Sequence, residues 1–188
     1  MPKYTQMIIG SIDYSLNSPC VTVFTGGIFK FQNCQSHYLN SIKRLTGKFK
    51  NITGHYYEPS SNQMERYIHI GTWAYELVKT CDFVILEDYS LGSKGKVFNI
   101  AENTAILKYL LHINNVPLQT LPPTKVKKFA TDKGNADKNL MYEHFIKDTG
   151  MDLKALFGCK GKNIVSPISD IVDSFYLLKF LESNHGVR

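Results

Sequence analysis

The chain has 188 residues, of which 43% are hydrophobic, enough to form one folded core and too many for a disordered chain. Its 22 Lys and Arg residues against 16 Asp and Glu residues give a net charge of +6, which suits a partner made of phosphates. No apolar run approaches the roughly 20 residues that cross a bilayer, and the first residues lack a signal-peptide pattern. We therefore expect a single cytoplasmic domain over residues 1–188, without a membrane, whose four scattered cysteines are reduced.

Three β-rich segments open the chain, over residues 7–13, 19–25 and 27–33. Gly26 and Gly27 tolerate the positive φ of a tight turn, so they predict a hairpin between the last two segments. Asp13 ends the first segment, in the sequence IGSID. A lone acid after a strand is more often a turn residue, so Asp13 by itself does not indicate a site.

Residues 34–61 give no clear pattern of helix or strand. Basic residues alternate there with aromatic rings, a mixture typical of proteins that bind a phosphate backbone and stack on bases. A solvated connection explains the same residues equally well. The residues concerned are Lys43, Arg44, Lys48, Phe49, Lys50, His55, Tyr56 and Tyr57.

Helical spacing returns over residues 62–80, and the apolar run of residues 82–87 then predicts a fully buried strand. That strand ends at Glu87. The loop over residues 89–97 is rich in Gly, Ser and Lys but lacks the spacing of a nucleotide-binding P-loop, so it reads as a flexible basic loop containing Lys94 and Lys96.

A helix over residues 98–114 and a strand over residues 116–121 lead to the most basic stretch, over residues 123–138. A solvated face and a nucleic-acid contact explain this stretch about equally well. A further helix is predicted over residues 136–148. The lysines of the basic stretch are Lys125, Lys127, Lys128, Lys133 and Lys138.

The last helix is predicted over residues 166–181, with Ser166 as its cap and Pro167 in its first turn. Asp170 and Asp173 lie one turn apart beside its apolar stripe, so their carboxylates repel unless they share a cation or a proton. Favourable interaction of first-turn acids with the helix dipole is the simpler explanation. The stripe consists of Ile168, Ile171, Val172, Phe175, Leu178 and Leu181.

Taken together, four acids stand at special positions: Asp13 and Glu87 at strand ends, and Asp170 and Asp173 on the last helix. Carboxylates from adjacent strand ends and a facing helix can hold two Mg²⁺ ions roughly 4 Å apart. Such a pair of ions activates water and stabilises the leaving oxygen in phosphodiester hydrolysis. The acids therefore predict a two-metal nuclease.

The order of these motifs resembles the RuvC family of Holliday junction resolvases, within the RNase H-like superfamily. The matching pieces are IGSID at residues 9–13, VILEDY at residues 84–89, the basic stretch at residues 123–138, and SDIVDSFYLL at residues 169–178. The resemblance implies an α/β fold with a mixed five-stranded sheet, three antiparallel strands followed by parallel strands, and helices on both faces. Residues 34–61 would be a variable insertion in this nuclease domain.

The resemblance also implies roles for individual residues. The four acids would bind two Mg²⁺ ions, for which Mn²⁺ can substitute, and Lys127 and Lys138 would support catalysis at the phosphate. The active form would be a homodimer that cuts opposed strands of a four-way DNA junction, with the helix after Glu87 as the dimer contact. Further DNA contacts are expected at Tyr89, Lys94, Lys96, Lys125, Lys128 and Lys133.

Two departures from the family pattern affect the expected substrate preference. The usual Asp-Pro-Gly after the first strand is Asp13-Tyr14-Ser15 here, and Asp132 replaces the first Gly of the usual Gly-x-Gly. The first departure is similar to viral and organellar branches. We therefore expect the cytoplasm of a bacterium or a virus-infected host cell, with an organelle left open.

Three other functions are compatible with parts of the pattern. An RNA-processing nuclease of the same fold and a module that binds junctions without cutting them are the main alternatives. The four acids disfavour the pure binder, because they repel phosphate. An actin-like ATPase needs a glycine-rich phosphate loop, which the residues after Tyr14 do not supply.

Overall fold

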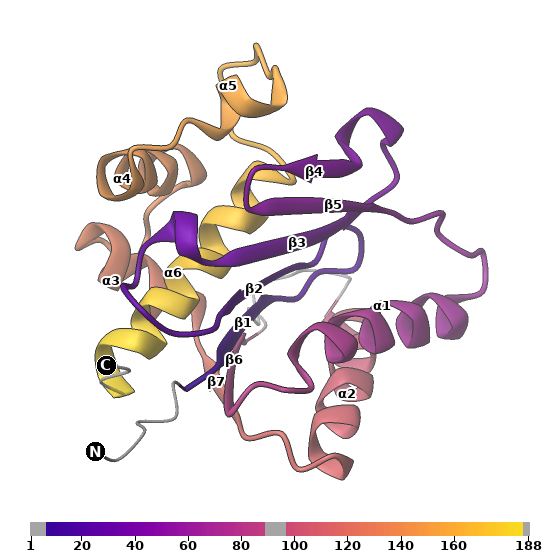
Figure 1. Ribbon diagram of the computed structural model, residues 1–188. Helices are drawn as coiled ribbons and strands as arrows, with labels where there is room; N and C mark the ends of the chain where they lie inside the picture. The colour runs from indigo at the N-terminus through magenta and orange to yellow at the C-terminus, as the bar shows by residue number, and fades with distance from the viewer. Residues whose placement is uncertain (1–6, 89–96, 186–188) are drawn as a thin grey trace.

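A mixed sheet of seven strands lies at the centre of the protein (Figure 1). The computed structural model describes residues 7–88 and 97–185. The strand order is β4-β5-β3-β2-β1-β6-β7, in which β1 is antiparallel to β2 and parallel to β6. The strands are β1 (Ile9–Asp13), β2 (Cys20–Phe24), β3 (Gln35–Asn40), β4 (Gly47–Phe49), β5 (Ile52–Tyr56), β6 (Phe83–Glu87) and β7 (Leu118–Leu121).

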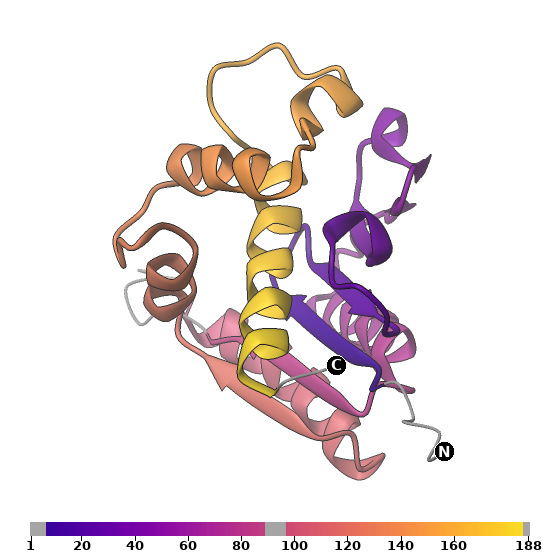
Figure 2. The ribbon, with the colours of Figure 1, turned by 60° about the vertical axis from the view of Figure 1, so that its left-hand side comes forward.

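Helices cover both faces of the sheet (Figures 1 and 2). On one face α1 packs against α2, and on the other α6 packs across β1 and β2 with α3 and α4 beside it, so that each face has its own buried core. No helix among the described residues is both long and apolar enough to cross a membrane. The helices are α1 (Gln63–Val78), α2 (Val97–Ile113), α3 (Pro123–Thr131), α4 (Lys138–Thr149), α5 (Leu153–Phe157), α6 (Ile168–His185) and the 3₁₀ helices η1 (Phe31–Asn33) and η2 (Lys43–Leu45).

The sheet confirms the predicted α/β class, with three antiparallel strands followed by parallel strands. The described part of the sheet has seven strands, however, where five were expected. The two additional strands, β4 and β5, come from residues 34–61, so this segment extends the sheet beyond β3. Strands as short and polar as β4 lack the alternation of apolar residues by which a strand is recognised in a sequence.

The predicted hairpin between residues 19–25 and 27–33 is wrong. Gly26 and Gly27 do have positive φ angles of 100° and 94°, but the chain after them turns away from the sheet and forms η1. The rings of Phe29 and Phe31 pack against Phe175 of α6, at centroid distances of 6.0 and 5.3 Å. These apolar side chains therefore fill the core between the sheet and α6, and the third strand forms later, at β3.

The last helix has the predicted buried stripe, with Ile171, Phe175 and Leu181 each at most 3% exposed. It begins at Ile168, two residues after Ser166. The basic stretch contains a helix that the sequence pattern missed, α3, which ends at Asp132 with a φ of 60°. Asp132 thus adopts the left-handed conformation for which the resembled family uses glycine, and aspartate is among the few other residues that tolerate it.

Candidate active site

Two of the four acids meet at the carboxyl edge of the sheet. Asp13 ends β1 and Glu87 ends β6, and because these strands are parallel neighbours with Ile12 opposite Leu86, both acids emerge at the same edge. Each of the two carboxyl groups affects the pKa of the other, so they lie close together. Two neighbouring carboxylates repel each other unless a proton or a cation is shared between them.

The other two acids come from α6, which packs over β1 and β2 and places its first turns beside that edge. Asp170 is buried, with 7% of its surface exposed, while Asp13, Glu87 and Asp173 are partly accessible. The negative charges of Glu87, Asp170 and Asp173 all act on Asp13. The structure therefore brings together the four acids that the sequence singled out.

Burial and mutual repulsion make this cluster hard to ionise. Burial is the main cause that raises the pKa of Glu87 to about 8, and repulsion by Asp173 adds to it. Burial, and then the charge of Asp170, raises the pKa of Asp173 to about 7, and the pKa of Asp13 is raised well above its usual range by burial and by Glu87. Without a cation, the cluster therefore retains protons at neutral pH.

Two lysines of the basic stretch reach this cluster. Lys127, on α3, lowers the pKa of both Glu87 and Asp173, and Lys138, at the start of α4, lowers that of Asp173. Lys125, Lys128 and Lys133 are exposed around them. Tyr89, Lys94 and Lys96 lie outside the described residues. Lys127 is half-buried and Lys138 is exposed, and these two lysines are the ones whose charges act on the acids.

Asp170 is held by two serines that the sequence patterns did not reveal. The hydroxyl of Ser18 donates a hydrogen bond to Oδ2 of Asp170 at 2.6 Å, and the hydroxyl of Ser169 donates to Oδ1 at 3.0 Å. Nζ of Lys138 in turn donates to the hydroxyl of Ser169 at 3.2 Å. The departure from Asp-Pro-Gly contributes here, because Oγ of Ser15 accepts from the backbone N–H of Ser18 at 2.9 Å and shapes the turn.

A chain of four buried hydroxyl groups lies between α6 and the sheet. Ser174 donates to the hydroxyl of Thr22 at 2.9 Å, and Thr22 bonds to Ser36 at 3.0 Å. Ser11 donates to the backbone carbonyl of Ser174 at 2.7 Å. Because all four side chains are fully buried, sliding α6 would leave polar groups without partners. This network fixes Asp170 and Asp173 relative to Asp13.

The donor set of the acid cluster fits Mg²⁺ by its chemistry, because all of its ligand atoms are carboxylate oxygens. Over residues 7–88 and 97–185, however, no group of three or more His, Cys, Asp and Glu side chains is already arranged to hold a metal ion. Binding of a divalent ion by these acids would require their carboxyl groups to lose their protons.

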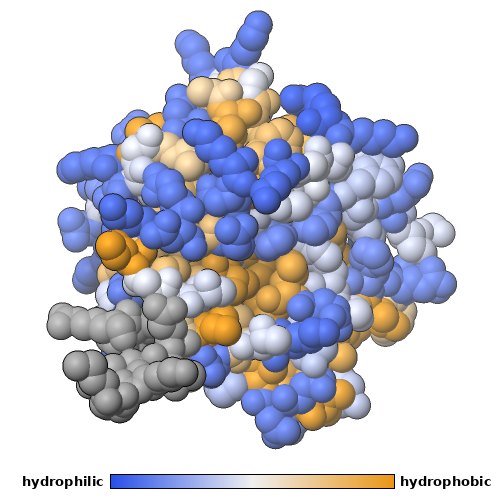
Figure 3. Space-filling view, in the orientation of Figure 1, coloured by the Kyte–Doolittle hydropathy of each residue, from blue (hydrophilic) through white to orange (hydrophobic). Residues whose placement is uncertain are grey.

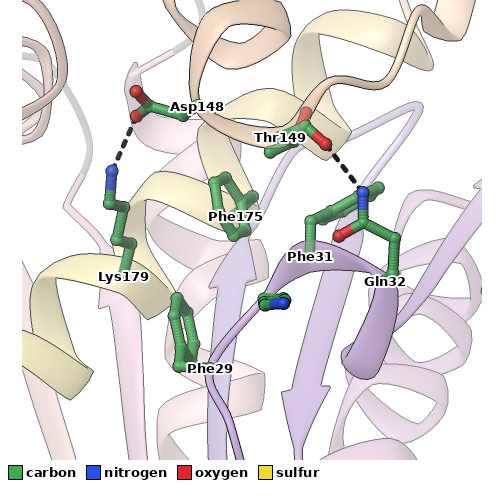
Figure 4. Close-up of a pocket in the computed structure, with 8 residues that line it drawn as sticks. Phe29, Phe31, Gln32, Asp148, Thr149, Phe175 and Lys179 are labelled. Atoms are coloured by element: carbon green, nitrogen blue, oxygen red, sulfur yellow. Dashed lines mark hydrogen bonds and ion pairs between the residues drawn. The ribbon is translucent and has the colours of Figure 1, made fainter.

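A hollow of about 520 Å³ lies elsewhere on α6 and contains none of the four acids (Figure 4). Phe29, Phe31 and Phe175 form its apolar wall. Its rim joins α4 to its neighbours, since Lys179 forms an ion pair with Asp148 at 2.6 Å and Nε2 of Gln32 donates to the carbonyl of Thr149 at 2.7 Å. We interpret this hollow as part of the packing of η1, α4 and α6.

Comparison with known proteins gives matches in structure only. No protein-family model and no curated protein sequence matches the chain. Thermus thermophilus RuvC is similar, with a TM-score of 0.58 and 15% identity over 96% of this chain and 98% of that one. T. thermophilus RuvC in complex with a Holliday junction substrate gives a TM-score of 0.57 and 15% identity, over 96% of this chain and 97% of that chain.

A eukaryotic structure shows the same likeness. The yeast mitochondrial Holliday junction resolvase Ydc2 has a TM-score of 0.53 and 15% identity, over 94% of this chain and 78% of that chain. The matches extend over nearly the whole chain, as the motif order indicated. The protein therefore has the fold seen in RuvC and in Ydc2.

Proposed function

We propose that the protein is a Mg²⁺-dependent endonuclease that cuts branched DNA at four-way junctions. The observation that carries this proposal is the convergence of Asp13, Glu87, Asp170 and Asp173 at one edge of a RuvC-like sheet, with Lys127 and Lys138 beside them. A surface that only binds DNA gains nothing from four clustered acids, because they repel phosphates. In a metal-dependent hydrolase, the same acids have a function, because they bind the metal ions.

The four acids would hold Mg²⁺, two ions per site, and Mn²⁺ would substitute. When bound, the metal supplies an activated water molecule and stabilises charge on the phosphate oxygens. Lys127 and Lys138 provide positive charge that attracts the scissile phosphate and offsets its repulsion from the acids. Ser18 and Ser169 orient Asp170, and the buried hydroxyl chain keeps α6 in register, so the carboxylates are positioned before the substrate arrives.

A homodimer would bring two such sites to the opposed strands of one junction. The outer face of α2 supports this proposal, because three large apolar side chains are exposed there: Phe98 at 83%, Tyr109 at 62% and Ile113 at 49%. A second copy that covers these side chains removes their apolar surface from water, which stabilises the dimer. The helix that follows Glu87 in the chain is thus our candidate for the dimer contact, as the sequence indicated.

The substrate class is tested by presenting three nucleic acids of matched length: a four-way DNA junction, a linear duplex and a structured RNA. Each is incubated with the protein in Mg²⁺ and in EDTA, and the cut positions are mapped on sequencing gels. We expect paired, symmetric nicks on the junction in Mg²⁺ alone. Cleavage of RNA in preference to the junction would identify an RNA-processing nuclease, and tight binding without any cleavage would identify a binding module; either result would overturn the proposal.

A further inference from the structure

The positive charge of the chain is concentrated in two stretches, residues 41–56 and 152–163, which we call the basic wing. The wing contains seven basic residues and one acidic residue, Asp152, so its net charge equals the +6 of the whole chain. The remaining residues, including the basic stretch with α3, carry fifteen charges of each sign. The basic residues of the wing are Lys43, Arg44, Lys48, Lys50, Lys154, Lys160 and Lys162.

The two stretches pack into one folded unit. The ring of Phe157 on α5 lies 5.0 Å from that of Phe49 on β4 and 6.0 Å from that of Tyr38 on β3. The hydroxyl of Tyr38 donates to the carbonyl of Leu45 at 2.6 Å. A Cβ atom at Gly54 would clash with that carbonyl oxygen and with the ring of Tyr38, so only glycine fits there. The charges of the wing are therefore carried by a packed structure.

Part of the wing lies on the same side of the sheet as the acid cluster: η2 follows the carboxyl end of β3, whereas Lys50 lies at the opposite end, before β5. The carboxyl ends of β5 and β1 lie at the same edge of the sheet, since β5 is parallel to β3, and β3 and β1 are both antiparallel to β2. The second stretch leads directly into α6, and the N–H of Ile164 donates to Oδ1 of Asn139, next to Lys138, at 3.2 Å. Figure 1 shows β4, β5 and α5 beside the start of α6, and Figure 3 shows hydrophilic side chains over this upper part of the molecule.

Among the described residues, the structure shows no ion pair for any of the seven basic side chains of the wing. The ion pairs of Lys79 with Glu76 and of Lys179 with Asp148 both lie outside it. Of the seven basic side chains of the wing, all except that of Lys154 are exposed. Clustered like charges repel one another, so a polyanion bound across them removes an unfavourable interaction. A merely solvated face would have both signs of charge interspersed.

The aromatic residues decide which form of nucleic acid fits. Surfaces that bind single strands present exposed rings on which bases stack. In the wing, the rings of Phe49 and Phe157 pack against each other, while the one exposed ring, Tyr56, has Nζ of Lys43 at 5.6 Å from its centroid. The wing therefore offers cations for phosphates and little surface for bases, which favours a duplex.

We propose that the basic wing binds the phosphate backbone of a double-stranded DNA arm next to the site of cleavage. This proposal rests on the function proposed above, since it assigns the wing to the same substrate. The additional strands β4 and β5 then have a role: they extend the sheet to carry phosphate contacts beyond the acid cluster. Because the contacts are to the backbone, the wing contributes affinity without sequence preference.

Fluorescence anisotropy in EDTA, with a labelled four-way junction at several salt concentrations, tests the wing without any cleavage. The test variants are Lys43→Ala/Arg44→Ala and Lys160→Ala/Lys162→Ala. The control is Lys79→Ala, which removes an exposed positive charge after α1, near the start of β6 and away from the wing. We expect each wing variant to lower the affinity about tenfold or more near physiological salt and to reduce the salt slope by roughly 1 to 2. The control should change neither quantity.

Equal effects of the wing variants and the control, or unchanged salt slopes, would overturn the proposal. A loss of affinity for single strands without a loss for duplex arms would also overturn it. The replaced side chains are exposed, so thermal denaturation should show unchanged folding, and Lys160→Arg/Lys162→Arg should retain binding. Because binding is measured without metal, a protein that binds through the wing yet never cuts would contradict the proposed nuclease alone.

Discussion

Replacing Asp13 by Asn is expected to reduce junction cleavage in Mg²⁺ by on the order of 10³-fold or more. Asp13 lies at the centre of the cluster, where Glu87, Asp170 and Asp173 all act on it. The amide keeps the shape of the side chain but removes the charge that a divalent ion requires. Single-turnover cleavage rates measure the effect, and the affinity for the junction in EDTA should stay the same or increase, because one negative charge is lost.

The control for this change is Glu143→Gln, which removes an exposed acid of α4 outside the cluster. Its cleavage rate should equal that of the original protein. If Asp13→Asn cleaves junctions at the normal rate, Asp13 is not a metal ligand.

Without metal, the free energy of unfolding is expected to fall as the pH rises from about 4 to about 8. The pKa values of Glu87 and Asp173 are raised from 4.5 and 3.8 to about 8 and about 7. The folded state therefore binds these protons more tightly than the unfolded state, so their contribution is complete below pH 4 and lost as the pH rises through the folded pKa values. The total change is on the order of a few kcal/mol.

A second group opposes this trend at lower pH. Burial, and then the neighbouring His55, lowers the pKa of His37 from 6.5 to about 4. A lowered pKa gives stability above the unfolded value that is lost as the pH falls. Because two carboxyl groups outweigh one imidazole, urea denaturation in EDTA should show stability that falls from about pH 4.5 to about pH 8, less steeply below pH 6.5, where His37 opposes the carboxyl groups, than above it. Glu87→Gln should reduce the slope over the whole range, His37→Asn should steepen it only below pH 6.5, and Mg²⁺ should restore stability at pH 8. A profile that is flat above pH 6.5 would contradict this account of the cluster.

Much of the fold could be predicted because its signals are local. The apolar run that ends in Glu87 and the apolar stripe of α6 indicate which surfaces are buried. Asp13 and Glu87 each end a strand, which predicts that both lie at one edge of the sheet. The convergence of the acids followed from these elements together with the order of motifs. The positions of Phe29 and Phe31 could not be predicted in this way, because an apolar residue can be buried equally well in a strand or beneath a helix.

The supporting residues of the site could not be found from local patterns. Ser11 and Ser174 are 163 residues apart in the chain, and Ser18 and Asp170 are 152 residues apart. The sequence around a serine does not indicate which distant residue its hydroxyl group binds, so these hydrogen bonds are seen only in the folded structure. The basic wing shows the same limit, because Lys43 and Lys160 join one surface only through the packing of Phe49 on Phe157.

The central claim is that Asp13, Glu87, Asp170 and Asp173 together bind divalent cations. Crystals of the protein soaked in Mn²⁺ near pH 8 and measured at the manganese absorption edge test it most directly. We expect anomalous peaks within roughly 2.0 to 2.6 Å of carboxylate oxygens from both strand ends and from α6. Manganese found only at other positions would contradict the claim.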